Sequence, residues 1–62
     1  AKIHHDLGEA TLSIFTNTGL KVIEIEDYES GAEINISQLS SGIYNYVLKG
    51  STYNSQATFV KR

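Results

Sequence analysis

Two groups of side chains in this sequence have types and a spacing that could support chemistry. His4, His5 and Asp6 are adjacent near the start of the chain, and imidazoles and carboxylates are metal ligands. Adjacent residues of a strand point to opposite faces, so the two imidazoles would not converge on one ion. We therefore interpret the triplet as an exposed edge and expect no metal there.

The second group is acidic, and it consists of Glu24, Glu26, Asp27, Glu29 and Glu33. Calcium requires several oxygen ligands from one loop, but this spacing matches no loop of the EF-hand type. Paired carboxylates also serve glycosidases, yet a chain of 62 residues leaves little room for a cleft around them. We expect a solvated acidic face.

The remaining polar and aromatic residues suggest no catalytic chemistry. The serines and histidines form no nucleophile motif, so we predict no catalytic, cofactor-binding or metal-ligating residue. Tyrosines could form a platform for a sugar, but Tyr44 and Tyr46 alternate in a strand-like run and are expected to pack inside. A carbohydrate-binding module would need Tyr28 and Tyr53 exposed on one surface.

The composition limits the class of protein. A domain of 62 residues without cysteine has a small core and no disulfide to support it. A net charge of −2 argues against nucleic-acid binding, and no apolar run reaches the roughly 18 residues that a membrane span needs. Because the chain contains no methionine, we expect it to be a piece of a larger protein.

Short strand-like runs separated by turn residues position these side chains. The run 11–16, the turn at residues 17–19 and the run 20–26 predict a hairpin. Further strands are expected over 2–5, 32–37, 43–49 and about 53–61. Six short strands and no helix predict an all-β fold, an antiparallel sandwich or partial barrel.

The alternation breaks within the second strand of the hairpin. Leu20 and Val22 share one face, whereas Ile23 and Ile25 share the other. A β-bulge near Val22 and Ile23, or a strand covered on both faces, would each account for this pattern.

The stretch "SQLSSG" connects two strand-like runs. Leu39 is out of phase with the preceding strand, so we expect it to plug the open end of the fold, and Gly42 to let the chain turn. Tyr44 then faces one layer, with Ile43 facing the other, as in a central strand. We expect positive φ at Gly19 and Gly42. The predicted core comprises Leu12, Ile14, Val22, Ile34, Ile36, Leu39, Tyr44, Leu48 and Phe59.

The hairpin "LSIFTNTGLKV", the segment "INISQLSSGIYNYVL" and the ending "FVKR" together resemble the C-terminal sorting domain of the type IX secretion system, a family of the Bacteroidetes. The likeness covers about residues 10–62. The family's apolar strand, turn glycine, Leu-x-x-Gly-x-Tyr box and closing lysine fall on Leu12, Ile14, Phe15, Gly19, Val22, Leu39, Gly42, Tyr44 and Lys61.

The resemblance implies that residues 1–62 are a single immunoglobulin-like β-sandwich, the C-terminal domain of a larger exported protein. Such a domain is a non-catalytic sorting signal that passes through the periplasm to the cell surface or the medium. Its partner would be a secretion-machinery protein at the outer membrane, with Lys61 and Arg62 as candidates for recognition.

One departure from the family leaves an alternative open. These domains begin after a Pro-Asn-Pro-like segment, and this chain has no proline. The alternative is a structural or adhesive immunoglobulin-like module that packs beside the parent protein's neighbouring domain, as in surface or tail-fibre-like proteins.

Overall fold

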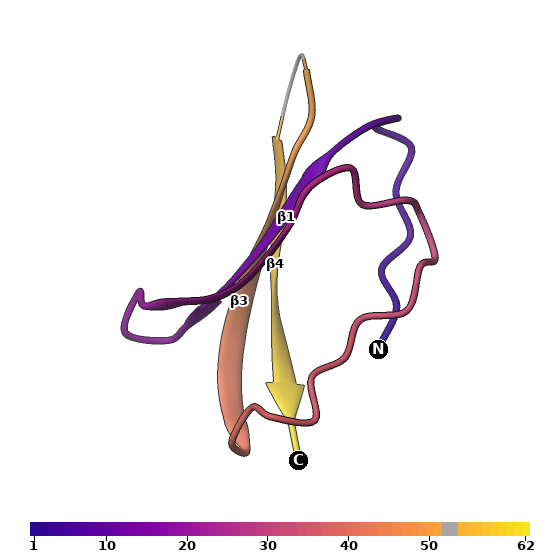
Figure 1. The fold of residues 1–62 in the computed structure, drawn as a ribbon. Coiled ribbons are helices and arrows are strands. Elements are labelled where there is room, and N and C mark those ends of the chain that lie inside the picture. The colour runs from indigo at the N-terminus through magenta and orange to yellow at the C-terminus, as the bar shows by residue number, and fades with distance from the viewer. Residues whose placement is uncertain (52–53) are drawn as a thin grey trace.

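The computed structural model describes residues 1–51 and 54–62, and within them it contains four β-strands and no helix. The strands are β1 (Thr11–Thr16), β2 (Lys21–Ile25), β3 (Gly42–Lys49) and β4 (Asn54–Lys61). They form one antiparallel sheet in the order β2-β1-β3-β4 (Figure 1). The all-β prediction is confirmed. In the described part of the chain no helix is long and apolar enough to cross a membrane.

β1 and β2 form the predicted hairpin. The amide of Thr16 donates to the carbonyl of Leu20 at 2.8 Å, and the amide of Gly19 donates back to the carbonyl of Thr16 at 2.9 Å. The φ angle of Gly19 is 96°, so the prediction of positive φ is confirmed at this turn. A Cβ at Gly19 would meet no atom within 4 Å, which means that the backbone conformation, and not space, favours glycine here.

An irregular register between β1 and β2 explains the broken alternation of the second strand. Ile14 lies opposite Ile23, but the next residue, Phe15, lies opposite Lys21, which leaves Val22 as an extra residue. This is one of the two predicted arrangements, the β-bulge. The bulge lets Ile23 share a face with Ile14, whereas Val22 is 37% exposed. The prediction that Val22 belongs to the core is wrong.

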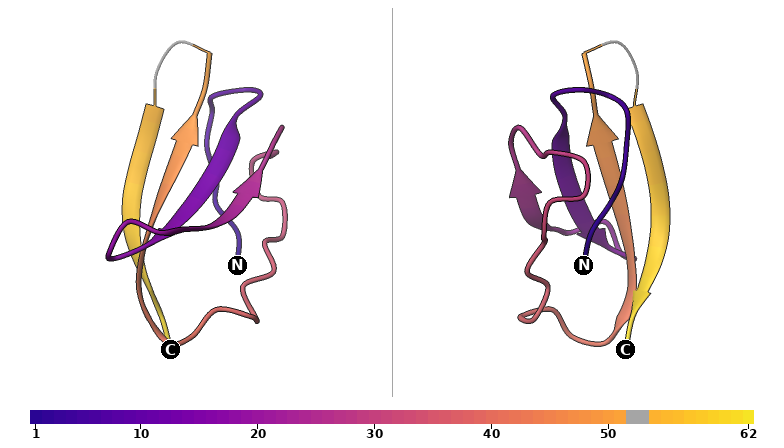
Figure 2. Two further views of the ribbon diagram at one scale, coloured as in Figure 1. Left: turned by 60° about the vertical axis from the view of Figure 1, so that its left-hand side comes forward. Right: turned by 90° about the vertical axis from the view of Figure 1, so that its right-hand side faces the viewer.

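Two irregular segments cover one face of the sheet. Residues 1–7 and 28–39, called the covering layer below, run along the same side of the sheet in all three views (Figures 1 and 2). Strands were predicted over 2–5 and 32–37, but the strand pairing in these ranges is limited to a single bridge between Lys2 and Glu33. The six-strand immunoglobulin-like sandwich is therefore not confirmed.

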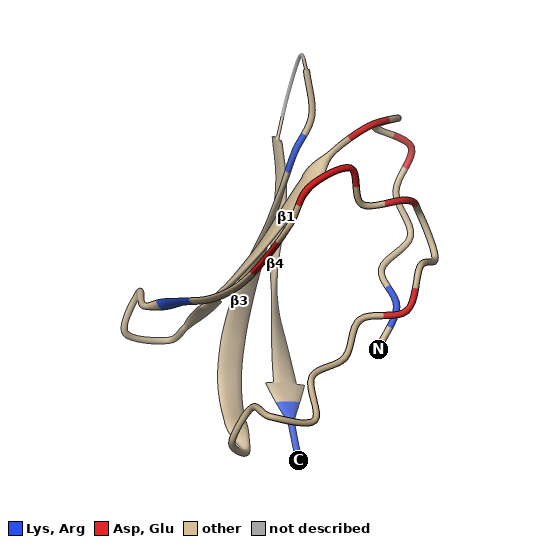
Figure 3. Ribbon diagram, viewed as in Figure 1, with Lys and Arg blue, Asp and Glu red and all other residues tan. Residues whose placement is uncertain are grey.

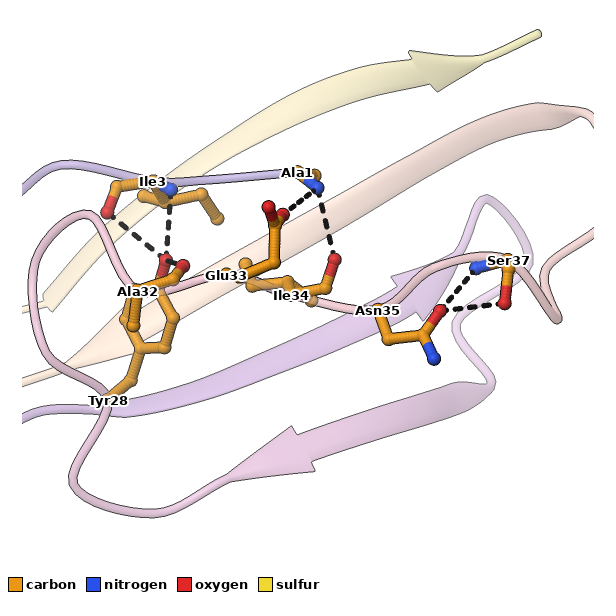
Figure 4. A network of polar contacts seen from close by, with 8 residues as sticks. All are labelled: Ala1, Ile3, Tyr28, Ala32, Glu33, Ile34, Asn35 and Ser37. Atoms are coloured by element: carbon orange, nitrogen blue, oxygen red, sulfur yellow. Dashed lines mark hydrogen bonds and ion pairs between the residues drawn. The ribbon is translucent and has the colours of Figure 1, made fainter.

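Local backbone chemistry explains why the covering layer lacks regular strands. Gly31 has a φ of 81°, which turns the chain out of the extended conformation. The side chain of Asn35 accepts the amide of Ser37 at 3.0 Å, so that amide is used locally and not in a ladder (Figure 4). β-propensity alone does not reveal either effect.

The core fills the space between the sheet and the covering layer. Leu12 of β1 lies opposite Leu48 of β3, and both side chains are fully buried. Three predicted core residues, Ile36, Leu39 and Phe59, pack against the buried cluster but remain partly exposed. The buried residues of the described chain are Ala10, Leu12, Ile14, Tyr28, Ile34, Tyr44 and Leu48.

The hydroxyl of Tyr28 joins the two segments of the covering layer. Tyr28 is 2% exposed, and its hydroxyl donates to the carbonyl of Ala32 at 2.6 Å and accepts the amide of Ile3 at 3.0 Å (Figure 4). The condition for a carbohydrate-binding module, that Tyr28 is exposed, is therefore not met. The sugar platform needed this side chain at the surface, and Tyr53, its proposed companion, lies outside the described residues.

We expect Tyr28→Phe to lower the free energy of unfolding by about 1–3 kcal/mol, because the amide of Ile3 and the carbonyl of Ala32 lose their hydrogen-bond partner. In a domain with a total stability of about 3–5 kcal/mol, a thermal melt followed by circular dichroism should show a clear loss. Leu20→Ala is the control, since Leu20 is exposed and its truncation should change stability by about 0.5 kcal/mol or less. Equal melting temperatures for the two variants would contradict a structural role for the hydroxyl.

Candidate recognition site

The residues of the sequence motif meet at one end of the sheet. Because Thr16 lies opposite Tyr44, β1 ends where β3 begins. Lys61 lies opposite Gly42, so β4 ends at the same place. We call this region, residues 16–22, 39–44 and 59–62, the C-terminal sheet end. In the two views of Figure 2 it is the lower part of the sheet, where the chain ends.

Three hydrogen bonds hold the crossover that leads into β3. The amide of Leu39 donates to the carbonyl of Ile36 at 3.0 Å, which closes a turn. The hydroxyl of Tyr44 donates to the carbonyl of Ser40 at 2.7 Å, and the ammonium of Lys61 donates to the carbonyl of Leu39 at 2.5 Å. The Leu-x-x-Gly-x-Tyr spacing thus brings the tyrosine hydroxyl back onto the loop that precedes it.

Gly42 is the first residue of β3, and its φ of 155° is positive, as predicted. This value lies near the limit of the region that favours glycine, so the conformational demand is weaker than at Gly19. A Cβ on Gly42 would meet no atom within 4 Å. The glycine therefore shapes the entry into β3 without making room for a neighbouring side chain.

Aromatic contacts attach the last strand to the sheet. Phe59 of β4 lies opposite Tyr44, and their rings stack with centroids 5.6 Å apart at an interplanar angle of 21°. Tyr46 contacts the same ring at 6.3 Å. Aromatic pairs of this kind contribute about 0.5–1.5 kcal/mol beyond the area they bury. Phe59 and Lys61 together hold the end of β4 against β3 and the crossover.

Lys61 and Arg62 were both predicted as recognition residues, and the structure places them differently. The ammonium of Lys61 is engaged with the backbone of Leu39, and the residue is half-buried. Arg62 follows the end of β4 and is exposed. The ammonium of Lys61 thus makes a contact within the fold, whereas Arg62 is the exposed basic residue beside it.

Apolar side chains are also exposed at the C-terminal sheet end. Ile43 lies opposite Val60 on the face away from the covering layer, where it was predicted to meet a second layer. In the described chain that face has no such layer. The exposed large apolar side chains are Leu20 (66%), Val22 (37%), Ile43 (51%) and Val60 (62%), and all four belong to this end. These four side chains were not predicted as a group, although the apolar residues on both faces of two strands were a signal for them.

Charge is distributed unevenly along the chain. All seven Asp and Glu residues lie between positions 6 and 33, and residues 37–62 carry only the basic Lys49, Lys61 and Arg62. Figure 3 shows the acidic residues in β2, in the loop after it and along the N-terminal and covering segments, and basic residues at the end of β4. The C-terminal sheet end therefore combines apolar side chains with positive charge.

The side chains first considered for metal binding lie elsewhere. The Nε2 of His5 lies 3.1 Å from the carbonyl oxygen of Tyr28, so this ring makes a hydrogen bond within the covering layer. No group of three or more potential ligands could hold a metal ion within residues 1–51 and 54–62.

A family model described as the secretion system C-terminal sorting domain matches residues 1–62, the whole chain. No curated protein and no solved structure matches the chain.

We expect Lys61→Met to lower the free energy of unfolding by about 1 kcal/mol, because it keeps the aliphatic stem but removes the donor to the crossover carbonyl. Lys49→Met is the matched control, since Lys49 is the exposed residue at the other end of β3. Urea unfolding of both variants measures the difference. If Lys61→Met is as stable as Lys49→Met, the bond to the crossover contributes nothing.

Proposed function

The chain belongs to the family of secretion system C-terminal sorting domains, and from this premise we propose that the secretion machinery recognises the folded C-terminal sheet end. The domain is a sorting signal for type IX secretion and marks the protein that carries it as a secreted one. Membership of this family indicates a non-catalytic role. The finer assignments below, the surface and the partner, are our proposal.

The observation that carries the proposal is the coincidence of motif, apolar surface and positive charge. The residues that position the crossover, Leu39, Gly42, Tyr44 and Lys61, surround the place where Ile43 and Val60 are exposed. Monomeric proteins rarely leave large apolar groups of this kind uncovered, and such patches mark interaction sites. The motif therefore builds the surface, and the exposed side chains with Arg62 contact the partner.

The partner in this proposal is a protein of the outer-membrane secretion machinery, met by the folded domain in the periplasm on its way to the cell surface or the medium. A folded end suits this role because a rigid surface loses little conformational entropy on binding. The domain comprises residues 1–62 of a larger exported protein.

The immunoglobulin-like architecture is part of the same proposal. The amide of Gly31 donates to the carbonyl of Ile3 at 2.8 Å, and the amide of Ile34 donates to the carbonyl of Ala1 at 2.7 Å. These bonds and the Lys2–Glu33 bridge support the covering layer as the rudiment of a second sheet.

The test fuses residues 1–62, with their native upstream segment, to a reporter with a signal peptide in a host that has type IX machinery. Exported and periplasmic reporter are then measured. We expect removal of Thr58–Arg62 to leave the reporter in the periplasm, because the deletion removes Phe59 and exposes the edge of β3. Export that is equally efficient without these residues would favour the structural or adhesive module.

A second set of variants tests the surface without disturbing the fold. Ile43→Ser with Val60→Ser replaces exposed side chains, so each change should alter stability by about 0.5 kcal/mol or less while export falls. Arg62→Ala should cause a smaller loss of export. The matched control is Glu26→Ser with Glu29→Ser, two exposed positions far from this end. Equal export by the surface and control variants would refute this surface.

A further inference from the structure

The free edge of β4 has a length and composition that favour pairing with another strand. β4 is last in the sheet order and pairs with β3 over eight residues, Asn54–Lys61. Within the described ranges no strand lies on its other side, so alternate backbone amides and carbonyls face outward along this edge. Only another extended backbone or water can satisfy such a row of groups.

The usual protections of an edge strand are present on β2 and missing on β4. β2 has five residues, carries a bulge at Val22 and includes the charged pair Lys21 and Glu24. β4 is longer, contains no proline and has a single charged residue, Lys61, at its end. Charge, bulges and short length are what prevent edge pairing, so β4 is the edge of this sheet that remains competent for it.

A groove next to this edge would receive the side chains of an added strand. Ala57 lies opposite Tyr46 and so faces the side of the covering layer, yet it is exposed, because that layer stops short of β4. The resulting groove has a volume of about 380 Å³ and is lined by Ile3, Ile36, Ala57 and Phe59, among others. An added strand would place every second side chain in it, which favours apolar residues at those positions.

Charge further restricts the partner. Residues 37–62 carry no acidic side chain, and β4 ends in Lys61 followed by Arg62. A strand that extends past this end meets two basic residues, one of them exposed. Complementarity therefore favours an acidic residue in the partner where it meets Arg62.

We propose that a segment of the secretion-machinery protein pairs as an added strand with the free edge of β4. Alternating apolar residues of this segment enter the groove, and an acidic residue meets Arg62. This inference rests on the proposed function and adds the mode of recognition. Backbone hydrogen bonds supply affinity with little dependence on sequence, while the groove and Arg62 supply selectivity.

A proline scan of residues 55–60 in the reporter fusion tests the pairing. Antiparallel geometry alternates residues whose amide faces β3 with residues whose amide faces outward. Thermal melts of the 62-residue variants separate the two classes, because proline at a residue whose amide faces β3 breaks the ladder and lowers the melting temperature. We expect proline at an outward-facing amide to leave the melting temperature unchanged and to lower the exported fraction about tenfold. A tenfold change corresponds to a loss of about 1.4 kcal/mol of binding free energy.

Folded variants of the outward class that export like the parent overturn the inference. If export by these variants is normal while Ile43→Ser with Val60→Ser abolishes it, the proposed surface stands and the edge pairing fails. If the parent fusion is not exported at all, the proposed function itself fails. The two failures are therefore distinguishable.

The charge of the partner is tested at Arg62, the exposed basic residue that follows β4. Arg62→Glu is expected to reduce export more than Arg62→Gln, because the first places a negative charge opposite the partner's acidic residue and the second only removes the positive charge. Equal or reversed effects overturn the acidic assignment. Sedimentation of the 62-residue chain examines a second copy as the occupant: a dimer abolished by the same outward prolines would overturn the assignment to the machinery.

Discussion

The buried hydroxyl of Tyr28 joins the two segments of the covering layer, together with backbone hydrogen bonds between them. The sheet has an apolar face that must be shielded from water, and no second sheet among the described residues does so. Two irregular segments shield it instead, and the hydroxyl of Tyr28 bonds to both, through Ile3 and Ala32. Irregular segments lack the repeated ladder of a strand pair, so one side chain with several partners has a large share in positioning them. Burial of Leu12 and Ile14 follows from that arrangement.

The extent of the covering layer explains why two surfaces of the sheet stay exposed, the groove beside β4 and the opposite face. The layer shields the buried side chains of β1 and β3 but leaves Ala57 of β4 exposed beside a groove. The opposite face of the sheet has no cover among the described residues, so Ile43 and Val60 face solvent. Exposed apolar surface of this kind is costly for a small domain unless a partner uses it. The unshielded edge and the exposed pair Ile43 and Val60 are both on β3 and β4, the half of the chain without acidic residues.

The family motif has a physical meaning in this arrangement. Lys61 is distant in sequence from Leu39 and Tyr44, and hydrogen bonds to the crossover backbone bring the three residues together. Lys61 thereby ties the last strand to the loop before β3, and the stacking of Phe59 on Tyr44 adds to that connection. A sorting signal whose last strand is fixed in this way presents Arg62 and its apolar neighbours in one orientation.

The sequence by itself determined the elements whose signals are local. The hairpin follows from alternation at Leu12 and Ile14 and from the turn at Gly19, and the phase change at Val22 indicated a bulge as one of two arrangements, of which the structure shows the bulge. The family was also recognisable, because its motif depends on residue order and spacing.

Only the tertiary structure decided how the remaining segments are used. Apolar alternation over 32–37 predicted a strand, but Asn35 binds the backbone amide of Ser37, and a single bridge, Lys2–Glu33, is the strand pairing that this range makes. Lys61 was predicted as a recognition residue, yet its ammonium donates to the carbonyl of Leu39. Long-range contacts of this kind depend on which segments meet in space, and a linear pattern of residue types carries no record of that.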